Sequence, residues 1–235
     1  MISKEDRETF NTLNLLDSVS EQLSYEKICE LSNEQISKYK ELLEKFKMIN
    51  NVDSNKYESD NVHIEKGKAL EDLVSYLMKI SGDIFYVDRN LRTSTNEIDQ
   101  IFSLKPKGKI LLSYRLINDK LETFLGECKN YNKAVDVTYI GKFCSLLLTN
   151  QVKLGILFSY NGISGENWSN GSGLVKKFYL SKERIEDRYC IIDFSIKEFE
   201  SILNGKNILQ IIDEQLKSLQ FDTDYTRHLS KHPAE

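Results

Sequence analysis

The sequence lacks several features that would point to particular protein classes. It has no apolar run near the roughly 20 residues that a membrane-spanning helix needs. Its opening residues, MISKEDRETF, contain no apolar signal-peptide core. The glycine-rich stretch 161–173 is not followed by the Lys-Ser/Thr pair of a phosphate-binding P-loop. We therefore expect a cytoplasmic protein with no membrane partner and no nucleotide-binding P-loop.

The cysteines are few and widely scattered. Cys29, Cys128, Cys144 and Cys190 form no CxxC pair, so we interpret them as reduced and buried, not as a disulfide or zinc framework. The net charge is −4, from 32 Lys and Arg against 36 Asp and Glu. This balance argues mildly against a nucleic-acid binder, although a local basic face can exist on an acidic protein.

The 235 residues suit one large domain, or one domain with helical additions. We expect a helical N-terminal region at 1–60, with the apolar spacing of 24–49 predicting one amphipathic helix. The polar segment 50–61 is predicted to be a loop. A second helix is predicted at 65–82, where a stripe of leucines recurs at three- and four-residue spacing.

After residue 82, the spacing of the apolar residues changes from that of a helix to that of strands. Strands are predicted at 83–91, 96–104, 108–117, 122–130 and 153–160, and a helix at 137–151. The segments 174–181 and 188–195 also suggest strands, and 195–219 suggests one last amphipathic helix. The expected fold class is α/β: a mixed sheet flanked by helices. We expect its core at 61–200, and a C-terminal helix and tail at 201–235.

The stretch FLGECKN, 124–130, places an acid and a base on one side of a strand that looks buried. Glu127 and Lys129 are two residues apart and so lie on the same face. Asp99 lies on an earlier predicted strand with isoleucines near it. If those strands are adjacent, the two carboxylates converge and need a cation between them. A hard cation such as Mg²⁺, with Mn²⁺ as a substitute, meets that need.

Asp99 followed by Glu127-Cys128-Lys129 resembles the PD-(D/E)XK nuclease superfamily. The helix at 65–82, with Gly67 and Glu71, resembles the first helix of Mrr-like restriction endonucleases. The resemblance covers roughly residues 64–160 and implies a restriction endonuclease-like fold. It implies that Asp99, Glu127 and the Cys128 carbonyl hold Mg²⁺, that Lys129 supports the nucleophile, and that Glu71 is an accessory acid.

Departures from the family pattern affect the expected DNA contacts more than the metal site. Ile98 stands where the motif has proline, and Lys142 stands where many Mrr-like proteins have Gln or His. Lys68, Asn130, Lys133 and Lys142 are candidate contacts to nucleic acid. Lys68, Lys133 and Lys142 can also be ordinary surface lysines.

The predicted function is that of a Mg²⁺-dependent DNA endonuclease, which the resemblance associates with restriction and defence against foreign DNA. A homodimer or larger defence assembly through the helical additions is expected. The main alternative is a catalytically silent or partner-dependent nuclease-fold subunit that serves as a binding or assembly module. A helical interaction protein with a scaffold core, and RNA as the substrate, also remain open.

Overall fold

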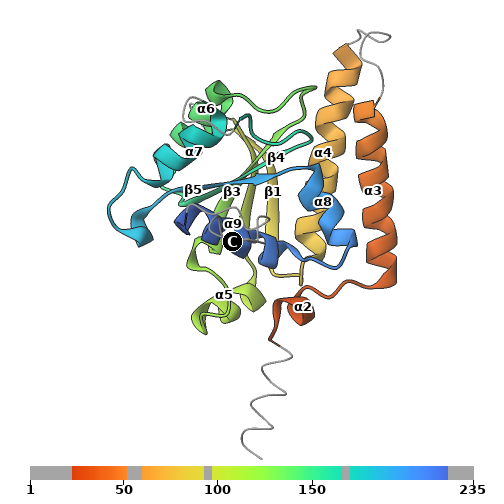
Figure 1. Ribbon diagram of the computed structural model, residues 1–235. Helices are drawn as coiled ribbons and strands as arrows, with labels where there is room; N and C mark the ends of the chain where they lie inside the picture. The colour runs from red at the N-terminus through yellow and green to blue at the C-terminus, as the bar shows by residue number, and fades with distance from the viewer. Residues whose placement is uncertain (1–22, 52–59, 93–96, 166–169, 222–235) are drawn as a thin grey trace, which may run out of the picture.

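A five-stranded mixed sheet lies between helices in the computed structural model, which describes residues 23–51, 60–92, 97–165 and 170–221 (Figure 1). The strands follow chain order across the sheet, from β1 to β5. The β1–β2 and β2–β3 pairings are antiparallel, whereas β3–β4 and β4–β5 are parallel. The expected mixed α/β sandwich is therefore confirmed.

The strands and helices have the following bounds. The strands are β1 (Phe85–Arg92), β2 (Glu97–Leu104), β3 (Thr123–Lys129), β4 (Leu154–Ser159) and β5 (Cys190–Phe194). The helices are α2 (Tyr25–Ile28), α3 (Asn33–Asn51), α4 (Asp60–Ile80), α5 (Pro106–Ser113), α6 (Val137–Thr149), α7 (Gly171–Tyr179), α8 (Ile196–Leu203) and α9 (Ile208–Phe221), with short 3₁₀ helices at Asp119–Leu121 and Ile185–Asp187. Within the described ranges, no helix combines the length and apolarity needed to cross a membrane.

Each face of the sheet has its own apolar core, because side chains alternate along a strand. Phe102, Phe124 and Phe158 belong to the core under α3, α4, α8 and α9. Leu125 and Leu157 belong to the core under α6 and α7. The β4 strand is buried along its whole length, as its continuous apolar run predicts.

Gly126 is the glycine of the FLGECKN stretch, and the packing of aromatic rings requires it. A Cβ at this position would lie 2.6 Å from a ring carbon of Phe102 and 3.2 Å from one of Phe158. The two rings pack edge to face with their centroids 6.4 Å apart. The missing side chain lets both rings meet over the middle of β3.

The predicted helix at 24–49 is two helices, because the chain breaks after Cys29 and restarts with a capping box. The Ser32 backbone N–H donates to the Gln35 side chain at 2.8 Å, and the Gln35 N–H donates to the Ser32 hydroxyl at 3.2 Å. Helix α3 then packs against α4 and α8, and the Tyr39 hydroxyl donates to the Phe199 carbonyl at 2.9 Å. The described part of the N-terminal region therefore shares its core with the sheet.

The predicted strand at 108–117 is wrong, since most of it belongs to α5 and the turn that follows. Pro106 stands in the first turn of this helix, where its fixed φ suits the helix and its missing N–H is not needed. Some apolar residues of this segment are not buried as the predicted strand requires, because Ile110 and Tyr114 are exposed. Without this strand, β3 pairs directly with β2.

The predicted strand at 174–181 is also wrong, because it lies mainly in α7. The buried residues Gly171, Val175, Phe178 and Tyr179 of this segment recur at helical spacing. Lys176 and Lys177 lie in the last turn, where positive charge favours a helix end. The apolar run in 174–181 is too short to distinguish helical spacing from a strand by sequence alone.

The predicted helix at 195–219 is likewise two helices. Ser195 and Glu198 form a capping box at the start of α8. Gly205, with φ 95°, follows its end and turns the chain. Asn207 then begins α9 by accepting a hydrogen bond from the Gln210 N–H at 2.9 Å.

Candidate active site at the end of strand β3

The β2 and β3 strands separate just before the predicted Glu-x-Lys motif. Their register ends at Gln100↔Gly126, while β3 continues to pair with β4 as far as Lys129↔Ser159. The Cys128 N–H is taken by the side chain of Asp99, whose Oδ2 accepts it at 2.9 Å. The Asp99 carboxylate thus replaces a backbone partner where the two strands part.

The sheet is also irregular on the other side of Asp99. The pairing of β1 with β2 passes from Arg89↔Gln100 to Leu91↔Ile98, and Asn90 between them has φ 53°. Asparagine tolerates this left-handed conformation better than most residues. The register is the same before and after Asn90, so no extra residue is inserted and the irregularity is confined to this one position. Asp99 therefore lies at a local distortion that involves both neighbouring strands.

Asp99, Glu127 and Lys129 form one charged cluster, as their positions in the sequence predict. The Lys129 Nζ lies 2.6 Å from Glu127 Oε1 and 3.5 Å from Asp99 Oδ2. The side chains of Lys129, Asp99 and Glu127 are 22%, 20% and 17% exposed, respectively. Burial alone lowers the pKa of Lys129, but the charges of Glu127 and Asp99 outweigh it and raise that pKa above its ordinary value.

Glu71 lies near this cluster, but its direct partner is an arginine. Arg89 donates to Glu71 Oε2 at 2.8 Å and to Asp72 Oδ1 at 3.0 Å. Burial is the main cause that raises the pKa of Cys128, and the charges of Asp99, Glu71 and Glu127 add to it. Glu71 therefore contributes negative potential at the site while Arg89 holds it in place. Its role as an accessory acid stays a prediction.

The chain that leaves β3 is fixed by α4 through Lys66, a residue that sequence reasoning missed. Lys66 is only 2% exposed, and its Nζ donates to Asn132 Oδ1 at 2.6 Å. The Asn130 Nδ2 donates to the Lys66 carbonyl at 2.9 Å. Lys66 precedes Leu70 and Leu73 by four and seven residues, so a lysine on the apolar stripe was the available signal.

The other candidate nucleic-acid contacts lie apart from these buried contacts. Lys68, Lys133 and Lys142 are exposed. The Lys142 Nζ lies 5.3 Å from the ring centroid of Tyr139, whose ring packs 5.0 Å from that of Tyr131. Burial is the main cause that raises the pKa of Tyr131 to about 12, and a hydrogen bond with Tyr139 adds to it. Tyr131, two residues after Lys129 in the chain, therefore forms an aromatic pair with Tyr139.

The donor set suits a small hard cation with few protein ligands. Within the described part of the chain, no group of three or more His, Cys, Asp or Glu side chains is arranged to hold a metal. Mg²⁺ commonly takes only one or two carboxylates and keeps several waters. The N–H and C=O of one strand residue point toward the same neighbour, so the Cys128 carbonyl is directed to the side of Asp99. Two carboxylates and this carbonyl fit Mg²⁺ chemically.

Comparison with known proteins gives no further support for an assignment. No protein-family model, no curated protein and no solved structure matches this chain. The argument for function therefore rests on the cluster itself.

Proposed function

We propose that this protein is a metal-dependent nuclease that hydrolyses phosphodiester bonds in DNA and has a restriction endonuclease-like core. The observation that carries the proposal is the convergence of Asp99, Glu127 and Lys129 where β2 and β3 part, with the Lys129 Nζ within 3.5 Å of both carboxylates. The order of the motif along the chain, and its resemblance to PD-(D/E)XK nucleases, supply the reaction class.

In this proposal Asp99, Glu127 and the Cys128 carbonyl hold Mg²⁺ or Mn²⁺. A bound Mg²⁺ would polarise the phosphate and make its coordinated water more acidic. The Lys129 ammonium would donate to the attacking water, or to the oxygens on which negative charge develops. The water oxygen bonds to phosphorus as the bond from phosphorus to the leaving sugar oxygen breaks, and that oxygen takes up a proton. The contacts made by Lys66 would keep the chain around Lys129 in place.

The test is incubation of the purified protein with supercoiled plasmid and Mg²⁺ or Mn²⁺. We expect nicked or linear product, no product in EDTA, and a loss of about a hundredfold or more in Asp99→Asn and in Lys129→Met. Asp88→Asn is the matched control, because Asp88 is an exposed carboxylate on β1. Parallel reactions with single-stranded DNA and with RNA define the substrate. Cleavage that persists in both site variants would refute this assignment of the site.

A catalytically silent binding subunit is the second candidate, and one observation favours it. Lys129 already occupies the position between the carboxylates, so the cluster is partly neutralised without a metal. This candidate predicts that the protein binds nucleic acid or a partner but leaves every plasmid and oligonucleotide intact. The expected role in restriction or defence against foreign DNA rests on the motif resemblance alone.

A further inference from the structure

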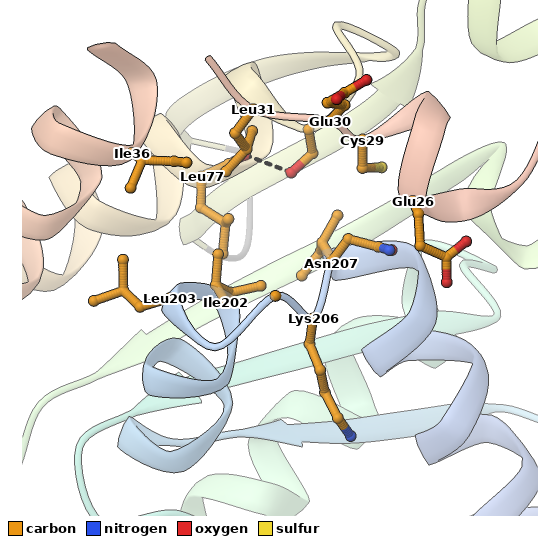
Figure 2. A pocket seen from close by; sticks show the side chains of 13 residues that line it. Glu26, Cys29, Glu30, Leu31, Ile36, Leu77, Ile202, Leu203, Lys206 and Asn207 are labelled. Atoms are coloured by element: carbon orange, nitrogen blue, oxygen red, sulfur yellow. Dashed lines mark hydrogen bonds between the residues drawn. The ribbon is translucent and has the colours of Figure 1, made fainter. Parts of the chain in front are cut away.

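A cavity and an aspartate on β5 lie outside the candidate active site. The cavity has a volume of about 190 Å³ and lies between α2, the turn before α3, the end of α4 and the α8–α9 connection (Figure 2). Charges at its rim are paired, since Glu30 is 3.2 Å from Lys27 and Lys206 is 2.6 Å from Glu214. These pairs give the cavity no clear preference for a charged ligand. Asp193 differs, because its immediate contacts assign it a role.

The carboxyl group of Asp193 has few hydrogen-bond donors around it. The residue lies on β5 opposite Leu157 of β4, and so on the sheet face that α6 and α7 cover. Its Oδ2 accepts the Ile163 N–H at 2.9 Å, whereas its Oδ1 is buried without a hydrogen-bond partner. A buried charge is far more costly than a buried neutral group unless donors surround it. This environment therefore favours the neutral carboxyl group over the ionised one.

The turn 160–164, which follows β4, packs directly on this carboxyl group. A Cβ at Gly162 would lie 2.9 Å from Asp193 Oδ2 and 3.5 Å from Oδ1, and Gly162 has φ 72°. Glycine meets both requirements, since it tolerates a positive φ and a close approach. The Gly162 N–H also donates to the Ser159 Oγ at 2.8 Å. The closed turn therefore helps to keep water away from the carboxyl group.

The same turn is hydrogen-bonded to the segment 131–135, which follows the Glu-x-Lys motif. The Val135 N–H donates to the Gly162 carbonyl at 2.8 Å, and the Ser164 N–H donates to the Val135 carbonyl at 2.9 Å. The Asn161 Nδ2 donates to a backbone carbonyl of this segment at 2.9 Å. A change that loosens the turn therefore also loosens the chain beside the candidate active site.

Burial is the largest influence on the ionisation of Asp193. It raises the pKa of this carboxyl group from 3.8 to about 6, while the bond from the Ile163 N–H lowers it. From α8, Glu198 raises this pKa and Lys197 lowers it. The β4 strand carries no charged residue, and α7 packs its apolar side on this face while its lysines are exposed. From α9, the neutral Gln215 donates to the Asp193 backbone carbonyl at 3.5 Å.

We propose that protonation of Asp193 controls how firmly the turn 160–164 closes and holds the segment 131–135. The neutral carboxyl group is compatible with the closed turn. The ionised group favours an open turn, in which water reaches Oδ1. The closed turn is therefore most stable below pH 3.8, the pKa of an exposed aspartate, and loses stability as pH rises to about 6. This device goes beyond the nuclease proposal and does not depend on it.

The experiment is amide hydrogen exchange of the full chain, followed by NMR at about pH 5 and about pH 7. After correction for the intrinsic pH dependence of exchange, the amides of Val135, Ile163 and Ser164 should open about tenfold more often at the higher pH. They should also be less protected than the amide of Ile156 in the buried strand β4. Equal protection of all four amides would mean exchange by global unfolding alone and would overturn the proposal.

One variant and one control separate ionisation from packing. Asp193→Asn keeps an oxygen that can accept the Ile163 N–H and cannot ionise, so opening of the turn should no longer depend on pH. Asp88→Asn removes an exposed carboxylate on β1 and should keep the wild-type pH dependence. The same pH dependence in wild type and Asp193→Asn would overturn the proposal.

The wild type alone decides the question if Asp193→Asn does not fold. The NMR signal of the Asp193 carboxyl carbon reports its ionisation directly, and the signal of the Ile163 amide reports the turn. We expect the two signals to titrate with the same midpoint. Different midpoints, or an Ile163 signal that does not change with pH, would overturn the proposal.

Discussion

Replacing Lys129 by methionine should destabilise the protein in a way that a divalent metal repairs. The Lys129 Nζ lies 2.6 Å from Glu127 Oε1 and 3.5 Å from Asp99 Oδ2. Methionine keeps most of the side-chain length and removes the charge. Two neighbouring carboxylates then lose their shared cation and repel each other.

The size of the effect follows from the burial of the three groups. Breaking a fully buried ion pair costs roughly 3–5 kcal/mol, and breaking an exposed pair costs roughly 0–1 kcal/mol. The side chains of Lys129, Asp99 and Glu127 are between 17% and 22% exposed. We therefore expect Lys129→Met to lower the free energy of unfolding by about 1–3 kcal/mol without metal, which lies between those limits. Excess Mg²⁺ should recover much of that loss, because bound ligand stabilises the folded state.

The assay is urea unfolding of wild type and Lys129→Met, each in EDTA and in excess Mg²⁺. Lys142→Met is the matched control, because it removes an exposed lysine that contacts only the ring face of Tyr139 among the described interactions. It should change stability by less than about 1 kcal/mol in either buffer. Equal stability of Lys129→Met and wild type in EDTA would refute the energetic argument. A deficit that Mg²⁺ leaves unchanged would refute a cation site at Asp99 and Glu127.

Three further predictions concern other parts of the molecule. Burial is the main cause that raises the pKa of Asp193 from 3.8 to about 6, so stability should fall as pH rises through that range. Asp193→Asn should remove about 1–2 kcal/mol of that fall, measured by urea unfolding at each pH; an unchanged pH profile would contradict it. Lys66→Met should speed hydrogen exchange at the amides of 130–132, whereas the exposed Lys68→Met should not; equal exchange in the two would contradict the contact with α4. Gly155→Ala should cost about 1–3 kcal/mol, because its Cβ would lie 2.6 Å from a phenylalanine ring atom of α6. Gly141→Ala has room and should be neutral or stabilising by about 0.5–1 kcal/mol, so similar melting temperatures would refute the packing argument.

The part of the charged cluster that the sequence predicts outright is the pair Glu127 and Lys129, because it depends on a short-range rule. Glu127 and Lys129 share a face through simple strand alternation. Asp99 joins them because β2 and β3 are neighbours, which the sequence left as a condition, since the strand wrongly predicted at 108–117 stood between them. The sequence could not show that Asp99 accepts the Cys128 N–H, because that contact depends on where the strand register ends.

The partners of Glu71 and the role of Lys66 were harder to predict. Arg89 reaches Glu71 from β1, and Lys66 reaches Asn132 across 66 residues of chain. No short-range sequence pattern predicts either contact, because both depend on how α4 packs against the sheet. A lysine among leucines was visible in the sequence, but its partner was not.

The errors in the fold come from short apolar segments. The stretch that contains α7 shows its helical period only in Val175, Phe178 and Tyr179, which span little more than one turn of the segment 174–181. Helix α5 begins with Pro106, a helix-start signal that the prediction of a strand at 108–117 left out of account. Short runs of this kind are ambiguous between helix and strand until packing decides.

The hydrogen bond between Tyr39 and Phe199 has a consequence for synthesis of the chain on the ribosome. The two residues are 160 positions apart, and translation adds roughly 5–20 residues each second. About 10–30 seconds therefore pass between the synthesis of Tyr39 on α3 and the synthesis of the α8 residues that contact it. During that interval Tyr39 and its neighbours are exposed to the cell, so the nascent chain is a natural client for chaperones that bind apolar segments.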